Sequence, residues 1–291
     1  MFSPRLAFAS GGAAAAGANA GWSPSPLIRA SAGLHALALL GVAAAPGAWP
    51  WLLGAVAVNH IGLGAIGMWP HSTLLGPNLV RLPPVRAQMA GRQVALTFDD
   101  GPDPAVTPAV LDLLDRHGAR ASFFCIGRRA AAHPALVREI VRRGHSVENH
   151  SDRHPNAFAC LPPGALAGEV ERAQARLADI AGQAPRFFRP PMGLRSPFLD
   201  PVLARLGLCH VSWTRRGYDA VSSEAPLVLR RLLRGLAAGD VLLLHDGGAA
   251  RAQGGRAVVL EVLPPLLERL AAEGFAAVTL ASGVAAEDQA A

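Results

Sequence analysis

The stretch VALTFDDGP at residues 94–102 decides the fold, because an apolar run leads there directly into two charged side chains. Its first residues are typical of a buried strand, and Gly101-Pro102 turns the chain away. Neighbouring strand residues face opposite sides, so both carboxylates can enter one cleft only where the strand ends. Adjacent carboxylates also repel, so a site must shift one pKa or neutralise one charge. Two interpretations follow: an ordinary turn, or a metal site with one ligand carboxylate and one free carboxylate.

Short apolar runs alternate with longer amphipathic ones from residue 92 onward. The predicted strands are 94–98, 121–125, 146–149, 187–189, 208–213, 241–245 and 276–280. The predicted helices are 107–117, 130–143, 165–180, 197–206, 226–238 and 256–273, with helix-ending glycines at Gly118, Gly144, Gly207, Gly239 and Gly274. This alternation predicts an α/β layer or barrel with a parallel sheet, in which chemistry collects at the carboxyl ends of the strands.

Two histidines follow the third predicted strand, in the sequence ENHSDRH at residues 148–154. His150 and His154 are four residues apart, so a helical turn would place both imidazoles on one face. Together with Asp100 they make a set of two histidines and one carboxylate, which leaves open coordination positions on a metal. Two surface histidines are the alternative. The position of each motif at a strand end favours the metal site.

Two further strand ends carry candidate catalytic groups. Arg189 follows the fourth strand in the rigid turn RPPMG at 189–193, and an arginine there can pair a carboxylate with fixed geometry. His245 follows an apolar strand in the sequence LLHD at 243–246, where it is a suitable general acid. Structural roles for both residues are the alternatives.

These motifs, in this order and spacing, resemble the polysaccharide deacetylases of the NodB homology type, carbohydrate esterase family 4. The resemblance covers roughly residues 92–281 and rests on TFDDGP, HSDRH, RPPMG and LLHD. It implies a distorted (β/α) barrel and a divalent metal, usually zinc, with cobalt, nickel, manganese or iron as alternatives. The implied reaction is the hydrolysis of a carbon–nitrogen bond that is not a peptide bond, which removes an acyl group from an N-acyl sugar.

The resemblance also implies roles for individual residues. Asp99 corresponds to the general base, Arg189 to the residue that orients it, and His245 to the general acid that Asp219 tunes. The implied metal ligands are Asp100, His150 and His154, and the implied substrate and oxyanion residues are Met192 and Trp213. This sequence departs from the family on the substrate side, with Ala220 in place of a tryptophan, Arg216 in place of an acidic residue and Met192 in place of a tyrosine.

The N-terminal part is apolar enough to cross a membrane. Hydrophobic residues make up 51% of the chain and charged residues 16%, and residues 30–45 and 51–69 carry no charge. We therefore predict a membrane helical hairpin at 27–70, with its turn at 46–50. Arginines flank the hairpin on both sides and are missing from the turn, so the positive-inside rule places both flanks in the cytoplasm of a bacterial-type inner membrane. The alternatives are one span at 51–69 with a periplasmic catalytic domain, or a buried hairpin packed on a soluble domain.

The predicted organisation is a disordered N-terminus at 1–26, the hairpin, a linker at 71–91, the catalytic domain at 92–281 and a tail at 282–291. The net charge of +6 comes without the mixed aromatic and basic pattern that single-stranded nucleic acid requires, so no nucleic-acid partner is expected. The expected partners are membrane lipid and an N-acylated glycan or glycolipid. The enzyme is expected to remove an acyl group from this substrate, and acetyl is the expected acyl group. A deformylase or deacylase of a lipid-linked sugar precursor at the cytoplasmic membrane face is the alternative, and a non-catalytic glycan-binding module is a third hypothesis.

Overall fold

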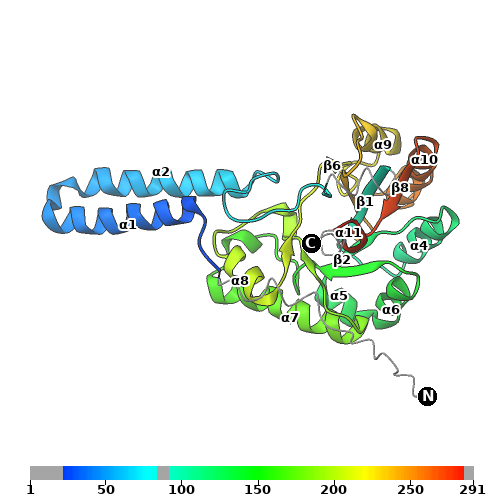
Figure 1. Cartoon of the computed structure of the whole chain (residues 1–291), viewed down its shortest axis with the longest axis horizontal. Helices are drawn as coiled ribbons and strands as arrows, with labels where there is room; N and C mark the ends of the chain where they lie inside the picture. Colours follow the sequence, from blue (N-terminus) through cyan, green and yellow to red (C-terminus); the bar gives the residue numbers. More distant parts are fainter. Residues whose placement is uncertain (1–21, 84–91, 285–291) are drawn as a thin grey trace, which may run out of the picture.

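A parallel sheet built around strand β1 (Arg92–Asp99) forms the core of the α/β domain (Figure 1). The computed structural model describes residues 22–83 and 92–284. The strand order is β5-β4-β3-β2-β1-β7-β6, with β8 also beside β1, and all these pairings are parallel. The other strands are β2 (Ser122–Cys125), β3 (Ser146–Asn149), β4 (Phe187–Phe188), β5 (Cys209–His210), β6 (Arg215–Arg216), β7 (Val241–His245) and β8 (Phe275–Val278). The predicted distorted (β/α) barrel is confirmed, as a parallel half-barrel.

Alternate residues of β1 face two different cores. Leu96 and Phe98 belong to the large cluster between the sheet and its covering helices, whereas Ala95 belongs to a smaller cluster inside the barrel. Because side chains alternate along a strand, Thr97 and Asp99 share the inner side with Ala95. The strand therefore delivers one carboxylate into the barrel interior at its last residue.

The helices follow the predicted pattern, with corrections at particular ends. Helices α4 (Thr107–Arg116), α7 (Pro163–Ala181), α8 (Leu199–Leu206), α9 (Ala225–Leu233) and α10 (Val259–Ala272) lie where expected, and the short 3₁₀ turns are η2 (Phe158–Cys160) and η3 (Pro191–Gly193). The predicted helix 130–143 is two helices, α5 (Gly127–Ala132) and α6 (Pro134–Arg142), because proline begins a helix more readily than it continues one.

Three further differences concern two element ends and one additional strand. Helix α9 ends at Leu233, so Gly239 does not terminate it. The predicted strand 276–280 stops at Val278, and helix α11 (Leu280–Val284) begins two residues later. Strand β6 was not predicted, since two adjacent arginines carry no strand signal.

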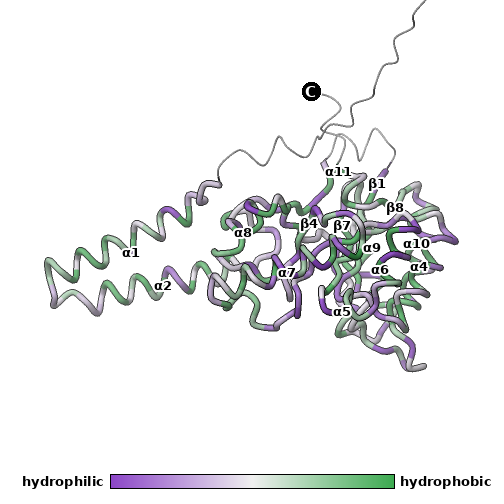
Figure 2. Tube along the Cα trace, turned by 90° about the horizontal axis from the view of Figure 1, so that it is seen from below, coloured by the Kyte–Doolittle hydropathy of each residue, from purple (hydrophilic) through white to green (hydrophobic). Residues whose placement is uncertain are grey.

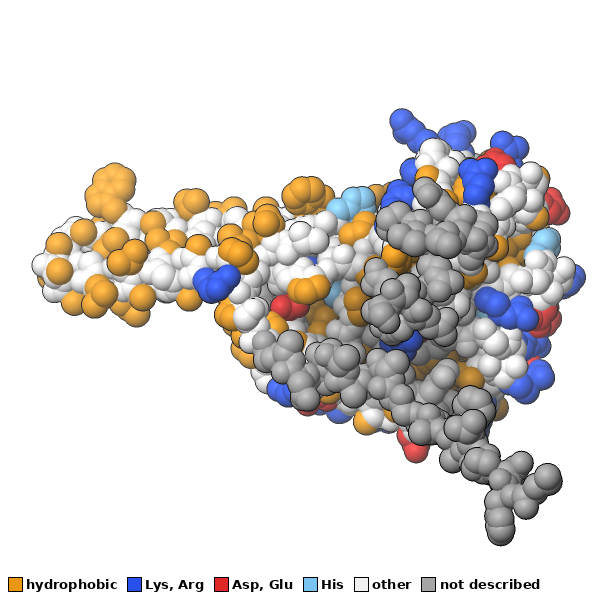
Figure 3. Space-filling view, in the orientation of Figure 1, with side chains coloured by type: hydrophobic (Ala, Val, Ile, Leu, Met, Phe, Trp, Pro, Cys, Tyr) orange, Lys and Arg blue, Asp and Glu red, His pale blue; other side chains and the backbone are white. Residues whose placement is uncertain are grey.

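The predicted hairpin is present as α1 (Pro26–Ala44), the 3₁₀ turn η1 (Pro46–Ala48) and α2 (Trp49–Gly67). Asn59 Nδ2 donates to Ser31 Oγ across the two helices at 2.8 Å. Hydrophobic residues run along both helices (Figure 2), and the hairpin extends away from the domain with its apolar side chains exposed (Figure 3). Both helices are long enough to cross a membrane, yet only 11% of the residues in the apolar 18-residue stretch of each helix are buried. The alternative of a hairpin buried against the domain is therefore wrong, and membrane insertion stays a prediction.

The segment that follows the hairpin joins it to the barrel. Leu79 forms a parallel bridge with Val211, just after β5, and Arg81 forms an antiparallel bridge with Asp240, just before β7. Leu82 is buried in the inner core. This part of the predicted linker is thus bonded into the barrel. Residues 1–21, 84–91 and 285–291, which hold most of the predicted disordered terminus and tail, lie outside the described residues.

Candidate active site

The side chains that the sequence singled out converge at the carboxyl edge of the sheet. Strand β1 ends at Asp99, which is in register with His245, the last residue of β7. His150 comes directly after β3, and Arg189 directly after β4. Parallel strands bring their carboxyl ends to one edge, so residues far apart in the chain meet there.

Asp99 is a buried carboxylate held by a buried guanidinium. Arg189 Nη1 donates to Asp99 Oδ1 at 2.5 Å and to Thr97 Oγ1 at 3.0 Å. Its Nη2 donates to the carbonyl oxygen of Ser212 at 2.9 Å, and its carbon Cζ lies 4.1 Å from the centre of the Phe124 ring. Buried charges are tolerated when they are paired and hydrogen-bonded. The pair therefore fixes the position of the Asp99 carboxylate.

Asp100, His150 and His154 form a group that suits a divalent metal. Their ligand atoms all lie within 4.8 Å of one another, and Asp100 Oδ1 is 3.3 Å from His150 Nε2 and 3.1 Å from His154 Nε2. His150 Nδ1 donates to the carbonyl oxygen of Arg189 at 2.6 Å, which leaves the Nε2 lone pair free. Burial raises the pKa of Asp100, but the adjacent histidines outweigh it and hold the pKa well below its usual range.

The surroundings of Asp100 Oδ1 test whether a metal fits. This oxygen is buried, and within the described part of the chain no donor satisfies it with a hydrogen bond. A buried oxygen without a partner is costly, and a cation would remove that cost. Two imidazoles and one carboxylate are also a common ligand set for catalytic zinc. The donor set therefore fits a divalent ion.

The loop that carries the two histidines is not helical, which corrects the expected helical turn. Ser151 and His154 both have left-handed backbone, with φ of 63° and 56°. Side chains stabilise this shape: Asn149 Oδ1 accepts from the Ser151 N–H at 3.0 Å, and Ser151 Oγ accepts from the His154 N–H at 3.1 Å. The histidines reach the same place by a local turn.

His245 and Asp219 form a second charged pair next to the first. Asp219 accepts from His245 twice, at its Oδ1 from the ring Nδ1 at 2.9 Å and at its Oδ2 from the backbone N–H at 2.7 Å. Burial lowers the pKa of His245, but the hydrogen bond and charge of Asp219 outweigh burial and raise it to about 9. The imidazole is therefore protonated at neutral pH and can give up a proton.

One small cavity connects these groups. It has a volume of about 120 Å³, and its wall includes Asp99, Asp100, His150, His154, His245, Met192 and Trp213. Arg189 and Asp219 contact their partners from behind this wall. Met192 lies on the exposed rim with φ of 59°, and Trp213 is buried. All the predicted site residues thus meet around one cavity, and their roles stay predictions.

Some residues of the site were missed from the sequence. Thr97 and the backbone of Ser212 bind Arg189. Asp246 accepts from Thr107 Oγ1 at 2.6 Å, burial raises its pKa to about 7, and it packs so closely on Gly101 that a side chain there would collide with it. Thr97 had a signal, since it shares the inner side of β1 with Asp99. Asp246 had a weaker one, as the neighbour of His245.

The motifs and the barrel have counterparts in known proteins. Residues 86–211 match the family model described as polysaccharide deacetylase. A chitooligosaccharide deacetylase from Azorhizobium caulinodans is 37% identical over 195 residues, which cover 63% of this chain and 90% of that protein. The chain belongs to the polysaccharide deacetylase family. It is therefore a hydrolase that acts on carbon–nitrogen bonds other than peptide bonds.

Other members of the polysaccharide deacetylase family agree in sequence and structure. A peptidoglycan-N-acetylglucosamine deacetylase from Bacillus cereus is 32% identical over 189 residues, 64% of this chain and 85% of that protein. The family 4 carbohydrate esterase from Streptomyces lividans, solved with acetate, superposes with a TM-score of 0.58 at 34% identity and covers 64% of this chain and 91% of its own. The Bc1960 peptidoglycan N-acetylglucosamine deacetylase superposes with a TM-score of 0.64 at 29% identity over 72% of this chain and 92% of its own.

Proposed function

We propose that this polysaccharide deacetylase removes the acetyl group from an N-acetylated amino sugar, with Asp99 as general base and His245 as general acid. One observation carries the proposal. The Asp99–Arg189 pair and the His245–Asp219 pair face the same cavity, next to the group that suits a metal. A base and an acid in one cavity are the groups that amide hydrolysis requires.

Each residue has a distinct task in this mechanism. Asp99, held by Arg189, takes a proton from the attacking water, whose oxygen forms the new bond to the acetyl carbon. His245 gives its Nε2 proton to the sugar nitrogen as the carbon–nitrogen bond breaks, so acetate and a free amine leave. We expect a backbone N–H near Met192 to stabilise the negative charge that develops on the acetyl oxygen.

Asp100, His150 and His154 would hold the divalent ion. When bound, zinc or a related ion supplies Lewis acidity and lowers the pKa of water. His150 is the best-supported ligand, because its Nδ1–H donates a 2.6 Å hydrogen bond to the Arg189 carbonyl oxygen. This hydrogen bond fixes the tautomer in which Nε2 can bind the ion. Arg189 thus positions both the base, through its side chain, and a metal ligand, through its backbone.

The cavity supports acetyl as the acyl group. The cavity is small, with a volume of about 120 Å³, which suits a small acyl group such as acetyl. The relatives are named as deacetylases of chitooligosaccharides and of N-acetylglucosamine in peptidoglycan, and the Streptomyces lividans enzyme was solved with acetate. N-acetylglucosamine is therefore the first sugar to test.

A lipid-linked amino sugar is the second candidate substrate, and the hairpin supports it. Two exposed apolar helices precede the catalytic domain, and the arginine pattern favours the cytoplasmic face for that domain. Mature wall glycan lies outside the cytoplasm, so a membrane-bound precursor is the substrate that such a site would meet. A formyl group would also fit the cavity.

Acetate release from N-acetylglucosamine oligomers by the purified full-length protein tests the proposed function. We expect chelator to abolish activity and zinc to restore it. Asp99→Asn should lower kcat by at least a hundredfold and keep the metal, whereas Asp100→Asn should lose the metal as well. Bound zinc is measured on both variants. Full activity of Asp99→Asn would refute the assignment of the base, and a metal-free, inactive wild type would favour the glycan-binding module.

A further inference from the structure

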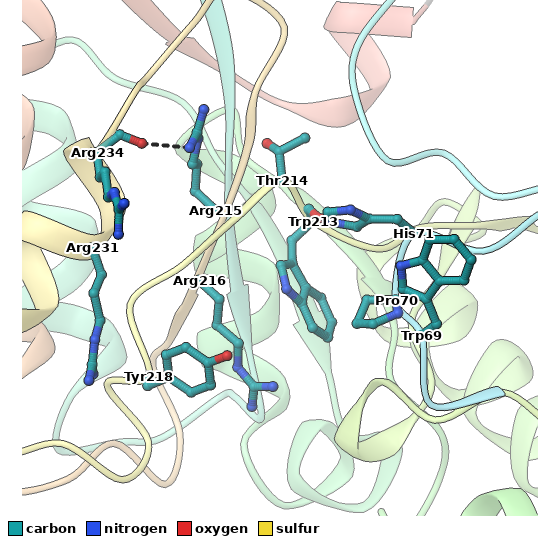
Figure 4. A pocket seen from close by; sticks show the side chains of 10 residues that line it. All are labelled: Trp69, Pro70, His71, Trp213, Thr214, Arg215, Arg216, Tyr218, Arg231 and Arg234. Carbon is teal, nitrogen blue, oxygen red and sulfur yellow. Dashed lines mark hydrogen bonds between the residues drawn. The ribbon is translucent and has the colours of Figure 1, made fainter. Parts of the chain in front are cut away.

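A second pocket lies beside the catalytic cavity and shares Trp213 and Arg216 with it. It has a volume of about 420 Å³ and brings together three parts of the chain (Figure 4). The loop after α2 contributes one wall, β6 and the residues around it a second, and α9 with its C-terminal cap a third. The residues that matter below are Trp69, His71, Arg216, Tyr218, Arg231 and Arg234.

The pocket is strongly positive. None of its lining residues is acidic, and Arg216, Arg231 and Arg234 form no ion pair with any acidic side chain of residues 22–83 and 92–284. Arg215 differs, because Asp240 and the carbonyl oxygens after α9 occupy its guanidinium. Arg231 Nη1 donates one long hydrogen bond, at 3.4 Å, to the Gly217 carbonyl oxygen. All three arginines therefore keep N–H groups that a ligand can accept from.

Arg216 and Arg231 lie on either side of the Tyr218 ring, and neither has an acidic partner among the described residues (Figure 4). Both stack on Tyr218, with their Cζ atoms 4.9 Å and 5.3 Å from the ring centre. Arg216 also lies 5.1 Å from the centre of the Trp213 ring, and its Nε is buried without a hydrogen-bond acceptor among the described residues. The contacts with the aromatic rings are favourable, but the buried Nε of Arg216 without an acceptor is costly, and an anion would supply that acceptor.

The position of the pocket indicates which anion. Trp69 and His71 come directly after α2, where the second predicted membrane helix ends, and the His71 ring is hydrogen-bonded to the carbonyl oxygen of Trp213 at 2.8 Å. Tryptophan at a helix end is typical of the membrane–water interface, where lipid phosphates lie. Planar guanidinium groups bind phosphate oxygens in pairs, and arginine is the residue best suited to this.

We propose that this pocket binds the phosphoryl group that links the amino sugar of a membrane-anchored substrate to its lipid. The proposal rests on the proposed deacetylase function and specifies its substrate class. Trp213 and Arg216 line both pockets, so the two sites adjoin at these residues. A sugar bound where the pockets adjoin can thus place its acetamide in the catalytic cavity and its linking phosphate near Arg216.

A matched pair of substrates isolates the phosphate. One is farnesyl-phosphoryl N-acetylglucosamine, and the other is the uncharged farnesyl N-acetylglucosaminide. We expect the full-length wild type to prefer the phosphoryl compound by at least about tenfold in kcat/KM, because charge-assisted hydrogen bonds are formed only with that compound. The double variant Arg231→Gln/Arg234→Gln should lose this preference. The control Arg138→Gln/Arg230→Gln removes the same charge from exposed positions outside the pocket and should keep it.

The preference is a ratio within one preparation, so partial misfolding of a variant does not alter it. Tryptophan fluorescence gives the dissociation constants of the same two compounds, so phosphate binding can be measured even if neither compound is hydrolysed. A lack of hydrolysis alone would refute only the deacetylase function. Equal affinities in the wild type, or a preference that survives in the double variant, would overturn the proposal. The proposal would also be overturned if the wild type showed no preference between the two compounds while phosphatidylglycerol changed hydrolysis of the uncharged compound only when the arginines are present. That result would assign the pocket to a lipid headgroup.

Discussion

Asp99 and Asp100 carry the same side chain in opposite settings. Asp99 is the last residue of β1, in extended backbone, and its carboxylate enters the barrel interior to meet Arg189. Asp100 has left-handed backbone with φ of 69°, which turns its side chain toward the two histidines. Arg129 Nη1 donates to the Asp100 carbonyl oxygen at 2.7 Å and so holds this turn. A change of backbone at one residue separates the proposed base from the proposed metal ligand.

The His245–Asp219 pair makes a prediction about pH. A general acid works only when protonated, so kcat should fall as the pH rises through the pKa of His245, which Asp219 raises to about 9. In Asp219→Asn the raising charge is gone and burial remains, so the alkaline limb should move to lower pH. Above the limb, kcat should drop about tenfold per pH unit. Profiles of kcat from pH 6 to 10 check this, and coinciding limbs in both proteins would rule it out.

At the residue scale, the sequence predicted which side chains form the site better than it predicted the backbone conformation that positions them. Every strand-end candidate lies in the cavity wall or, for Arg189, directly behind it, because strand ends are readable from apolar runs and parallel strands share an edge. The left-handed turns at Asp100, Ser151 and His154 were not readable, because no local preference marks them. The site depends on these strained positions, which burial and hydrogen bonds elsewhere stabilise.

The short turn η3 packs against Trp213, which lines both the catalytic cavity and the arginine-rich pocket. Gly193 has φ of 71°, and a side chain there would overlap the Trp213 ring. Trp213 in turn lies against the Arg189 guanidinium, whose Cζ is 5.9 Å from the ring centre. The turn therefore sets the position of the tryptophan that forms part of both pockets.

Gly193→Ala should damage both stability and activity. A second glycine, Gly182 at the end of α7, has φ of 72° and open space around it, so it is a matched control. Alanine at Gly182 should cost about 1–2 kcal/mol for left-handed backbone alone. Alanine at Gly193 should cost about 1–3 kcal/mol more for the collision, and should lower kcat as Trp213 moves. Urea unfolding and acetate release measure both effects, and equal losses of stability would contradict this role of the turn.

At the scale of elements, the prediction failed mainly at a proline inside one apolar pattern and at a strand made of charged residues. Strand β6 is two arginines, and it forms because β7 offers free backbone groups at Leu242 and Leu243. Proline at 134 divides one apolar pattern into two helices. Both results come from neighbours in space or from backbone chemistry, which the spacing of apolar residues does not record.

The molecule as a whole joins an exposed apolar hairpin to a basic catalytic domain. Arginine side chains gather over α9 on the face shown in Figure 3, away from the tip of the hairpin. Apolar length is a composition signal, so the pair of helices was predictable from sequence, whereas the orientation inferred from the arginines stays a prediction. The way the hairpin seats on the domain was not, because it depends on backbone contacts such as the Arg195 N–H to the Gly67 carbonyl at 3.0 Å.

Reporter fusions test the orientation. We expect alkaline phosphatase fused after Ala291 to be inactive and green fluorescent protein there to fluoresce, because both flanks of the hairpin should be cytoplasmic. Alkaline phosphatase fused after Gly47, in the turn, should be active and serves as the control. An active phosphatase at the C-terminus would instead support one span and a periplasmic enzyme.

The bridges of Leu79 and Arg81 have a consequence for how substrate is found. The chain leaves the hairpin and within a few residues is bonded into the barrel, beside β5 and β7. If the hairpin spans a bilayer, the mouth of the active site stays at one height and one tilt relative to the lipid surface. Encounter then becomes a search by lateral diffusion in two dimensions, in which the surface density of the substrate, rather than its bulk concentration, sets the rate.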